Sequence, residues 1–162
     1  MDLLEAKNRV AEALVESIFR RARYEVTPYR REGQGPLRVG REDLSPDFVV
    51  RPAGEGQGKE LLVEVKYHPQ IGQFMSVESQ RGERSLLQMA RRQWPDLYFV
   101  LVTDRPEPGR SCFQACLLST WAPGAASATV DLAAVPELGI FAHNVGDHEE
   151  LSRRIFALLS GA

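Results

Sequence analysis

The segment LLVEVKYHP, residues 61–69, carries two charged side chains within an otherwise apolar run. Glu64 and Lys66 are two residues apart, so in an extended chain both point to the same face. A second acid, Asp47, opens the apolar segment PDFVVRP, residues 46–52. Because the glycine-rich turn AGEGQGKE joins the two segments, we expect an antiparallel hairpin that brings Asp47 beside Glu64.

Two neighbouring carboxylates repel each other, and each raises the pKa of the other. A divalent cation between them removes that repulsion, and one or two carboxylates with open water positions suit Mg²⁺ or Mn²⁺. The ammonium group of Lys66 would hold or deprotonate an attacking water and offset phosphate charge. These residue types in this pattern therefore predict a site that hydrolyses phosphodiesters.

A purely structural role for the same residues is the open alternative. Glu64 and Lys66 would then be a solvated ion pair on a half-exposed strand, and Pro46 with Asp47 would only begin a strand. The apolar neighbours of Glu64 and the arrival of Asp47 opposite it favour the site.

The remaining sequence indicates which elements position these residues. Apolar spacing predicts helices over residues 2–23 and 83–94, and a capping pattern at Asp147 predicts a last helix over residues 148–160. Strands are expected at residues 24–30, 46–52, 61–68, 96–104, 111–119 and 139–145, with 96–104 buried on both faces. Residues 32–45 predict a loop or loose hairpin, residues 69–82 a mobile segment, and residues 121–139 a connection with a turn of helix.

The order α-β-β-β-α-β-β-(β)-α predicts one domain over residues 1–162. Its class is mixed α/β (α+β), with a central mixed sheet flanked by helices.

Pro46-Asp47, followed by Glu64-Val65-Lys66, resembles the signature of the PD-(D/E)XK nuclease superfamily, which has the restriction-endonuclease-like fold. The preceding helix and the segment YEVTPYR are similar to the archaeal Holliday-junction-resolvase branch. The resemblance covers residues 9–103.

This resemblance implies a Mg²⁺- or Mn²⁺-dependent endonuclease, with DNA favoured over RNA as the expected substrate. Asp47 and Glu64 would bind the metal with the backbone carbonyl of Val65, and Lys66 would orient water. A glutamate on the first helix joins the metal site in that family, and Glu12 is the matching position. An exposed helix carboxylate is an equally open interpretation of Glu12, and Glu5 and Glu16 are weaker candidates.

The exonuclease branch of the superfamily often carries Gln-x-x-x-Tyr after the EVK strand. No glutamine at positions 70, 73, 80, 88 or 93 has a tyrosine four residues later. This departure favours a small stand-alone endonuclease or junction-binding enzyme. A catalytically inactive module of the same fold, binding nucleic acid or a protein partner, is the alternative.

Arginines are clustered over residues 20–41 and 81–92, which is what a phosphate backbone requires beside an acidic site. The candidate contacts to nucleic acid are Arg30, Arg31, His68, Arg81 and Arg84. Solvated helix faces, with glutamates nearby, are an equally open interpretation of these arginines.

Bulk composition sets the remaining bounds. The formal net charge is −2, so any binding of nucleic acid must depend on a local patch of basic residues. No segment approaches the roughly 18 apolar residues of a membrane span, and the first residues lack the apolar core of a signal peptide. Two cysteines at a spacing of four are expected as small core residues. We therefore expect a cytoplasmic protein, and by analogy with small nucleases a possible homodimer.

Overall fold

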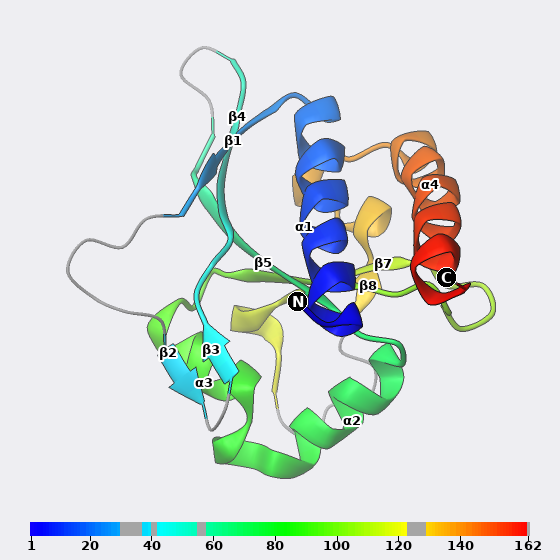
Figure 1. The fold of residues 1–162 in the computed structure, drawn as a ribbon. Coiled ribbons are helices and arrows are strands. Elements are labelled where there is room, and N and C mark those ends of the chain that lie inside the picture. Colours follow the sequence, from blue (N-terminus) through cyan, green and yellow to red (C-terminus); the bar gives the residue numbers. More distant parts are fainter. Residues whose placement is uncertain (30–36, 40–41, 55–57, 123–128, 162) are drawn as a thin grey trace.

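The structure, a computed structural model, describes residues 1–29, 37–39, 42–54, 58–122 and 129–161 (Figure 1). Its helices are α1 (Leu3–Arg21), α2 (Ile71–Arg81), α3 (Leu86–Gln93) and α4 (Ala142–Gly161), with short 3₁₀ turns at Gly82–Arg84, Leu118–Thr120, Leu132–Ala134 and Pro136–Leu138. Its strands are β1 (Tyr24–Pro28), β2 (Leu37–Val39), β3 (Glu42–Leu44), β4 (Phe48–Pro52), β5 (Leu61–Tyr67), β6 (Tyr98–Val102), β7 (Phe113–Leu117) and β8 (Val130–Asp131).

A six-stranded mixed sheet lies at the centre, in the order β1-β4-β5-β6-β7-β8. Its pairs are antiparallel except β5 with β6, which run parallel. Parallel neighbours need a crossover connection, and α2 and α3 supply it. The mixed α/β class, the β4–β5 hairpin and the burial of every β6 residue are confirmed.

Helices α1 and α4 cover one face of the sheet (Figure 1). The stripe that predicted α1 is the buried one: Ala11, Leu14, Val15, Ile18 and Phe19 pack on the sheet. From β5 this core takes Val63, Val65 and Tyr67. Because side chains alternate along a strand, Glu64 and Lys66 point to the other face.

The other face is covered by α2, α3 and the small β2–β3 sheet. Leu86, Leu87 and Ala90 of α3 pack there with Leu44 of β3. The antiparallel β2–β3 pair confirms the loose hairpin as the better interpretation of residues 32–45, as far as these are described.

Two expected elements are wrong. Residues 69–82, expected as a mobile segment, contain the eleven-residue helix α2. Residues 139–145, expected as a final strand, contain the start of α4, which begins at Ala142. Asp147 is therefore inside α4 rather than its cap, and its carboxylate pairs with Arg21 at 2.8 Å. The two-residue strand β8 was not expected, whereas a turn of helix over residues 131–138 is confirmed by two 3₁₀ turns.

Candidate active site

The candidate site lies where β4 and β5 separate. Their pairing covers only three residue pairs and ends at Phe48 opposite Val63. One residue earlier, the backbone N–H of Asp47 still donates to the carbonyl of Val63 at 2.8 Å. The Asp47 carboxylate then accepts from the N–H of Val65 at 2.7 Å. The Asp47 side chain thus continues the β4–β5 hydrogen-bond ladder beyond the end of β4. This contact fixes the carboxylate against β5.

Glu12 and Glu64 approach Asp47 from opposite layers. Glu12 comes from α1, on one face of the sheet, and Glu64 projects from β5 towards the other face. Both carboxyl groups lie close enough to the Asp47 carboxyl to change its pKa, and the bond from Val65 places that carboxyl at the end of the β4–β5 ladder. The expected neighbourhood of Asp47 and Glu64 is present, and Glu12 joins it. What the sequence did not reveal is that the acids meet through a gap in the sheet.

Burial and mutual repulsion make these acids hold protons tightly. Burial raises the pKa of Asp47 to about 7, the bond from Val65 opposes this rise, and the charge of Glu12 adds to it. Burial, then Asp47 and Glu12, raise the pKa of Glu64 well above its usual value. Burial also raises the pKa of Glu12. Without a bound cation, ionisation of all three carboxyl groups near neutral pH is therefore unfavourable.

Glu64 has an oxygen with no partner. Its Oε2 is buried and forms no hydrogen bond. A buried carboxylate oxygen without a donor is costly, because it has lost its hydration shell without compensation. Such an atom marks a place for a donor or a cation.

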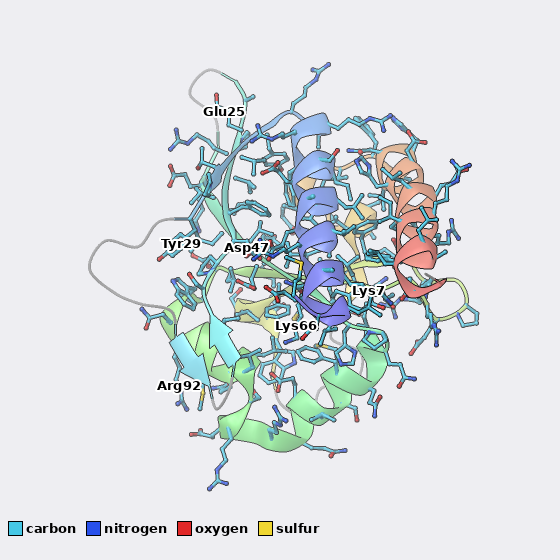
Figure 2. All side chains as sticks on the ribbon, viewed as in Figure 1. Lys7, Glu25, Tyr29, Asp47, Lys66 and Arg92 are labelled. Atoms are coloured by element: carbon cyan, nitrogen blue, oxygen red, sulfur yellow. The ribbon has the colours of Figure 1, made fainter. Side chains whose placement is uncertain are left out.

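Lys66 lies on the same face of β5 as Glu64, two residues on. Its charge lowers the pKa of Glu64, although burial and the neighbouring acids outweigh it. The ammonium nitrogen is 5.7 Å from the centre of the Phe74 ring of α2, a cation–π distance. Figure 2 labels Asp47 and Lys66, and in that view both lie near the N-terminal half of α1, the helix that carries Glu12.

Asn8 is a residue of the site that the sequence did not indicate. Its Oδ1 accepts from the backbone N–H of Tyr67 at 2.8 Å, and its Nδ2 donates to Glu12 Oε1 at 3.2 Å. A lone Asn on an amphipathic helix gives no signal of such contacts. The position four residues before Glu12, one helical turn away, was the only available hint.

A second polar cluster lies at the end of β5, around the hydroxyl of its last residue. The Tyr67 hydroxyl donates to Asp104 Oδ1 at 2.6 Å, and Lys7 Nζ donates to the same hydroxyl at 3.3 Å. Lys7 and Asp104 also form an ion pair at 3.8 Å, with side chains only 12% and 16% exposed. This cluster ties α1 to the end of β5, next to the acids.

Of the residues predicted to contact nucleic acid, those that the structure describes lie near opposite ends of α2. Arg30 and Arg31 lie outside the described residues. His68 follows β5 directly, and there its Nδ1 accepts from the Gln70 N–H at 3.0 Å and its ring packs on Phe74. Arg81 ends α2, about 15 Å along the helix from its first residue, and Arg84 follows in the next 3₁₀ turn; both are exposed. Arg81 pairs there with Glu78 at 3.5 Å.

A cavity of about 620 Å³ lies on another flank of α2. Its walls include Gln73 and Ser76 of α2, and Arg105, Arg110 and Gln114 beyond β6. None of the four predicted catalytic side chains lines it, so it is separate from the acids.

The residues present fit a magnesium-type ion better than a closed metal cage. Across the described parts of the chain, no three Asp, Glu, His or Cys side chains are spaced as a ready-made binding group. Mg²⁺ is usually held by one or two carboxylates and keeps several waters. Asp47 and Glu64, which repel each other and of which Glu64 has a buried oxygen without a hydrogen bond, meet that requirement. The Val65 N–H faces Asp47, and in a strand the carbonyl of the same residue is expected at the same edge.

No protein-family model, curated protein or solved structure matches the chain. In the described residues, no helix is long and apolar enough to cross a membrane. Any assignment of function therefore depends on the geometry of the site.

Proposed function

We propose that the protein is a metal-dependent nuclease that hydrolyses phosphodiester bonds, acting as an endonuclease on DNA. The observation that carries the proposal is the meeting of Glu12, Asp47 and Glu64 in the opening between β4 and β5, with Lys66 beside them. The fold we propose is the restriction-endonuclease-like fold of the PD-(D/E)XK superfamily. The mixed sheet and the motif on two consecutive antiparallel strands support it.

The roles of the side chains follow from their positions. Asp47, Glu64 and the Val65 carbonyl would hold Mg²⁺ or Mn²⁺, and Glu12 would hold the cation or a water bound beside Asp47. When bound, the cation would stabilise the negative charge that develops on the phosphate and on the leaving oxygen. The ammonium group of Lys66 would orient the attacking water and offset phosphate charge.

The acid cluster also makes substrate binding depend on the cation. Three carboxylates repel a phosphate, so the substrate can approach only after their charge is neutralised. Lys66 supplies one positive charge on the face of β5 where the substrate would lie. The DNA contacts themselves, the cytoplasmic location and a homodimer remain predictions from the sequence.

A non-catalytic nuclease-fold module that binds nucleic acid or a protein partner is the second candidate. The bond from Val65 to Asp47 favours it, because it gives this acid a structural role as a cap on the β5 edge. The two candidate functions differ in whether they require the Lys66 amine. A cap needs the Asp47 oxygen alone, whereas hydrolysis needs the amine too.

The deciding experiment is a cleavage assay with Mg²⁺ or Mn²⁺ on branched, single-stranded and duplex DNA, with RNA in parallel. We expect the parent to cleave at least one DNA substrate, and Lys66→Ala to lose about 10²-fold or more in rate. Lys59→Ala, which removes an exposed ion pair with Asp96, is the matched control and should cleave like the parent. A parent that cleaves none of these substrates with either metal would favour the binding module.

A further inference from the structure

Asn8 stands between the candidate site and the strand that carries it. It lies one turn before Glu12 on α1 and is half-buried. One end of its amide meets the backbone of Tyr67, the residue after Lys66, and the other end meets the Glu12 carboxylate. A single side chain therefore connects the helix acid to the catalytic strand.

The need for such a connection arises from the gap in the sheet. After Val63, β5 has no partner strand on the β4 side, so the N–H groups of Val65 and Tyr67 lack a strand partner. Asp47 accepts from the first at 2.7 Å and Asn8 from the second at 2.8 Å. Two side chains thus take the place of the missing strand, and both belong to the cluster around the acids.

The chemistry of the partners fixes the orientation of the Asn8 amide. The Tyr67 N–H is a donor and requires the carbonyl oxygen, whereas the Glu12 carboxylate is an acceptor and requires the NH₂ group. An amide can meet both requirements at once. Alanine meets neither, and aspartate would place a second negative charge against Glu12.

We propose that Asn8 is a positioning residue, which holds the Glu12 carboxylate at Asp47 by anchoring it to the backbone of β5. This inference rests on the proposed function in that Glu12 is taken to serve the metal site. Asn8 itself touches neither substrate nor metal. Partners that orient a ligand from behind typically change metal affinity by about 10–100-fold when removed.

The first test is a double-mutant cycle on the affinity for Mn²⁺. Asn8→Ala should weaken binding about tenfold when Glu12 is present, and by less than about twofold in the Glu12→Ala background. Ser17→Ala is the control: it removes another contact of α1, the 2.8 Å bond to His148, away from the acids, and should leave Mn²⁺ affinity unchanged. An equal loss in both backgrounds would show that Asn8 acts on the fold alone and would overturn the proposal.

The second test needs no metal and separates the two proposals. In the metal-free protein at pH 8, the carboxyl carbon NMR signal of Glu12 should shift in Asn8→Ala and stay in place in Ser17→Ala. Exchange of the Tyr67 amide hydrogen should be faster in Asn8→Ala than in the parent. An unmoved Glu12 signal would refute the positioning role. A parent that binds no Mn²⁺ but shows both changes would refute the nuclease proposal and leave the positioning role intact.

Discussion

The carboxylate of Asp47 accepts a 2.7 Å hydrogen bond from the backbone N–H of Val65, the residue between Glu64 and Lys66. This contact links the two halves of the sequence motif directly, across the end of the β4–β5 ladder. Because Val65 sits between the other two motif residues, fixing its backbone also fixes where the side chains of Glu64 and Lys66 begin. One acid therefore organises the site as well as contributing charge to it.

The stability of the metal-free protein should fall with rising pH because of Asp47. A group whose pKa is raised by folding, here from 3.8 to about 7, stabilises the fold fully below its unfolded pKa. That contribution is lost as the pH rises to 7 and beyond. Measured against Asp47→Asn, which keeps an oxygen for Val65, the parent should lose about 1–3 kcal/mol of unfolding free energy between pH 4 and pH 8.

Urea unfolding of both proteins, without metal, measures this difference. The subtraction removes the effect of carboxyl groups outside the acid cluster, such as Asp131, whose pKa is lowered by its hydrogen bonds from Ser111 and Gln114 and by Arg110. The remaining difference reports on Asp47 together with Glu12 and Glu64, whose pKa values Asp47 influences. A parent–variant difference that stays constant across this pH range would contradict the raised pKa.

Tyr67→Phe should affect stability and leave metal binding alone. The variant loses the hydroxyl that donates to Asp104 and accepts from Lys7. We expect a loss of about 1–2 kcal/mol in unfolding free energy, because the hydrogen bond to a carboxylate is partly shielded from water. Mn²⁺ affinity should stay within a factor of about two of the parent, since the Tyr67 backbone N–H still bonds to Asn8. A large loss of affinity would show that the Lys7 cluster is part of the site.

Glu78 should be essential to the corner between α2 and α3. Its side chain is 1% exposed and Oε1 accepts from the N–H of Leu87 at 2.8 Å, in the first turn of α3. Glu78→Ala should cost about 1–3 kcal/mol in unfolding free energy because this N–H loses its acceptor in a buried place. Glu78→Gln retains an acceptor and should cost less. Equal losses for the two variants, measured by urea unfolding, would count against this role.

The same residue explains why α2 was not predicted. The face of α2 that lies on the core includes Phe74 and Met75, but its buried position is the charged Glu78. Apolar spacing finds a helix only when the buried positions are apolar. The buried carboxylate is stabilised by the N–H of Leu87 in α3, which lies outside the segment itself.

The start of α4 was mispredicted for a related reason. Asn144 and His148 are buried and polar, and they bond to α1: Asn144 Nδ2 donates to the Ile18 carbonyl at 3.0 Å and His148 contacts Ser17 at 2.8 Å. A buried polar face hides the helical pattern and leaves Ile140 and Phe141 to suggest a strand. Such long-range partners become visible only in the folded chain.

Where the local sequence pattern and the tertiary contacts agree, the sequence was sufficient to predict which element carries each site residue. The apolar stripe of α1 and the alternation in β5 place Glu12, Glu64 and Lys66 on their elements, and the glycine-rich turn predicts the hairpin that brings in Asp47. The early separation of β4 from β5 was not predictable, because pairing length depends on where neighbouring layers pack. Asn8, which compensates for that separation, was missed with it.

The central claim is that Asp47 and Glu64, with Glu12 beside them, hold a divalent cation, and metal-dependent thermal stability tests it most directly. At pH 7.5 the parent should gain about 2.7 kcal/mol when Mg²⁺ or Mn²⁺ exceeds its Kd a hundredfold, seen as a rise in Tm. Asp47→Asn should lose this rise, whereas Asp96→Asn, which changes an exposed acid paired with Lys59, should keep it. A Tm of the parent that neither metal changes, or an equal rise in Asp47→Asn, would contradict the account.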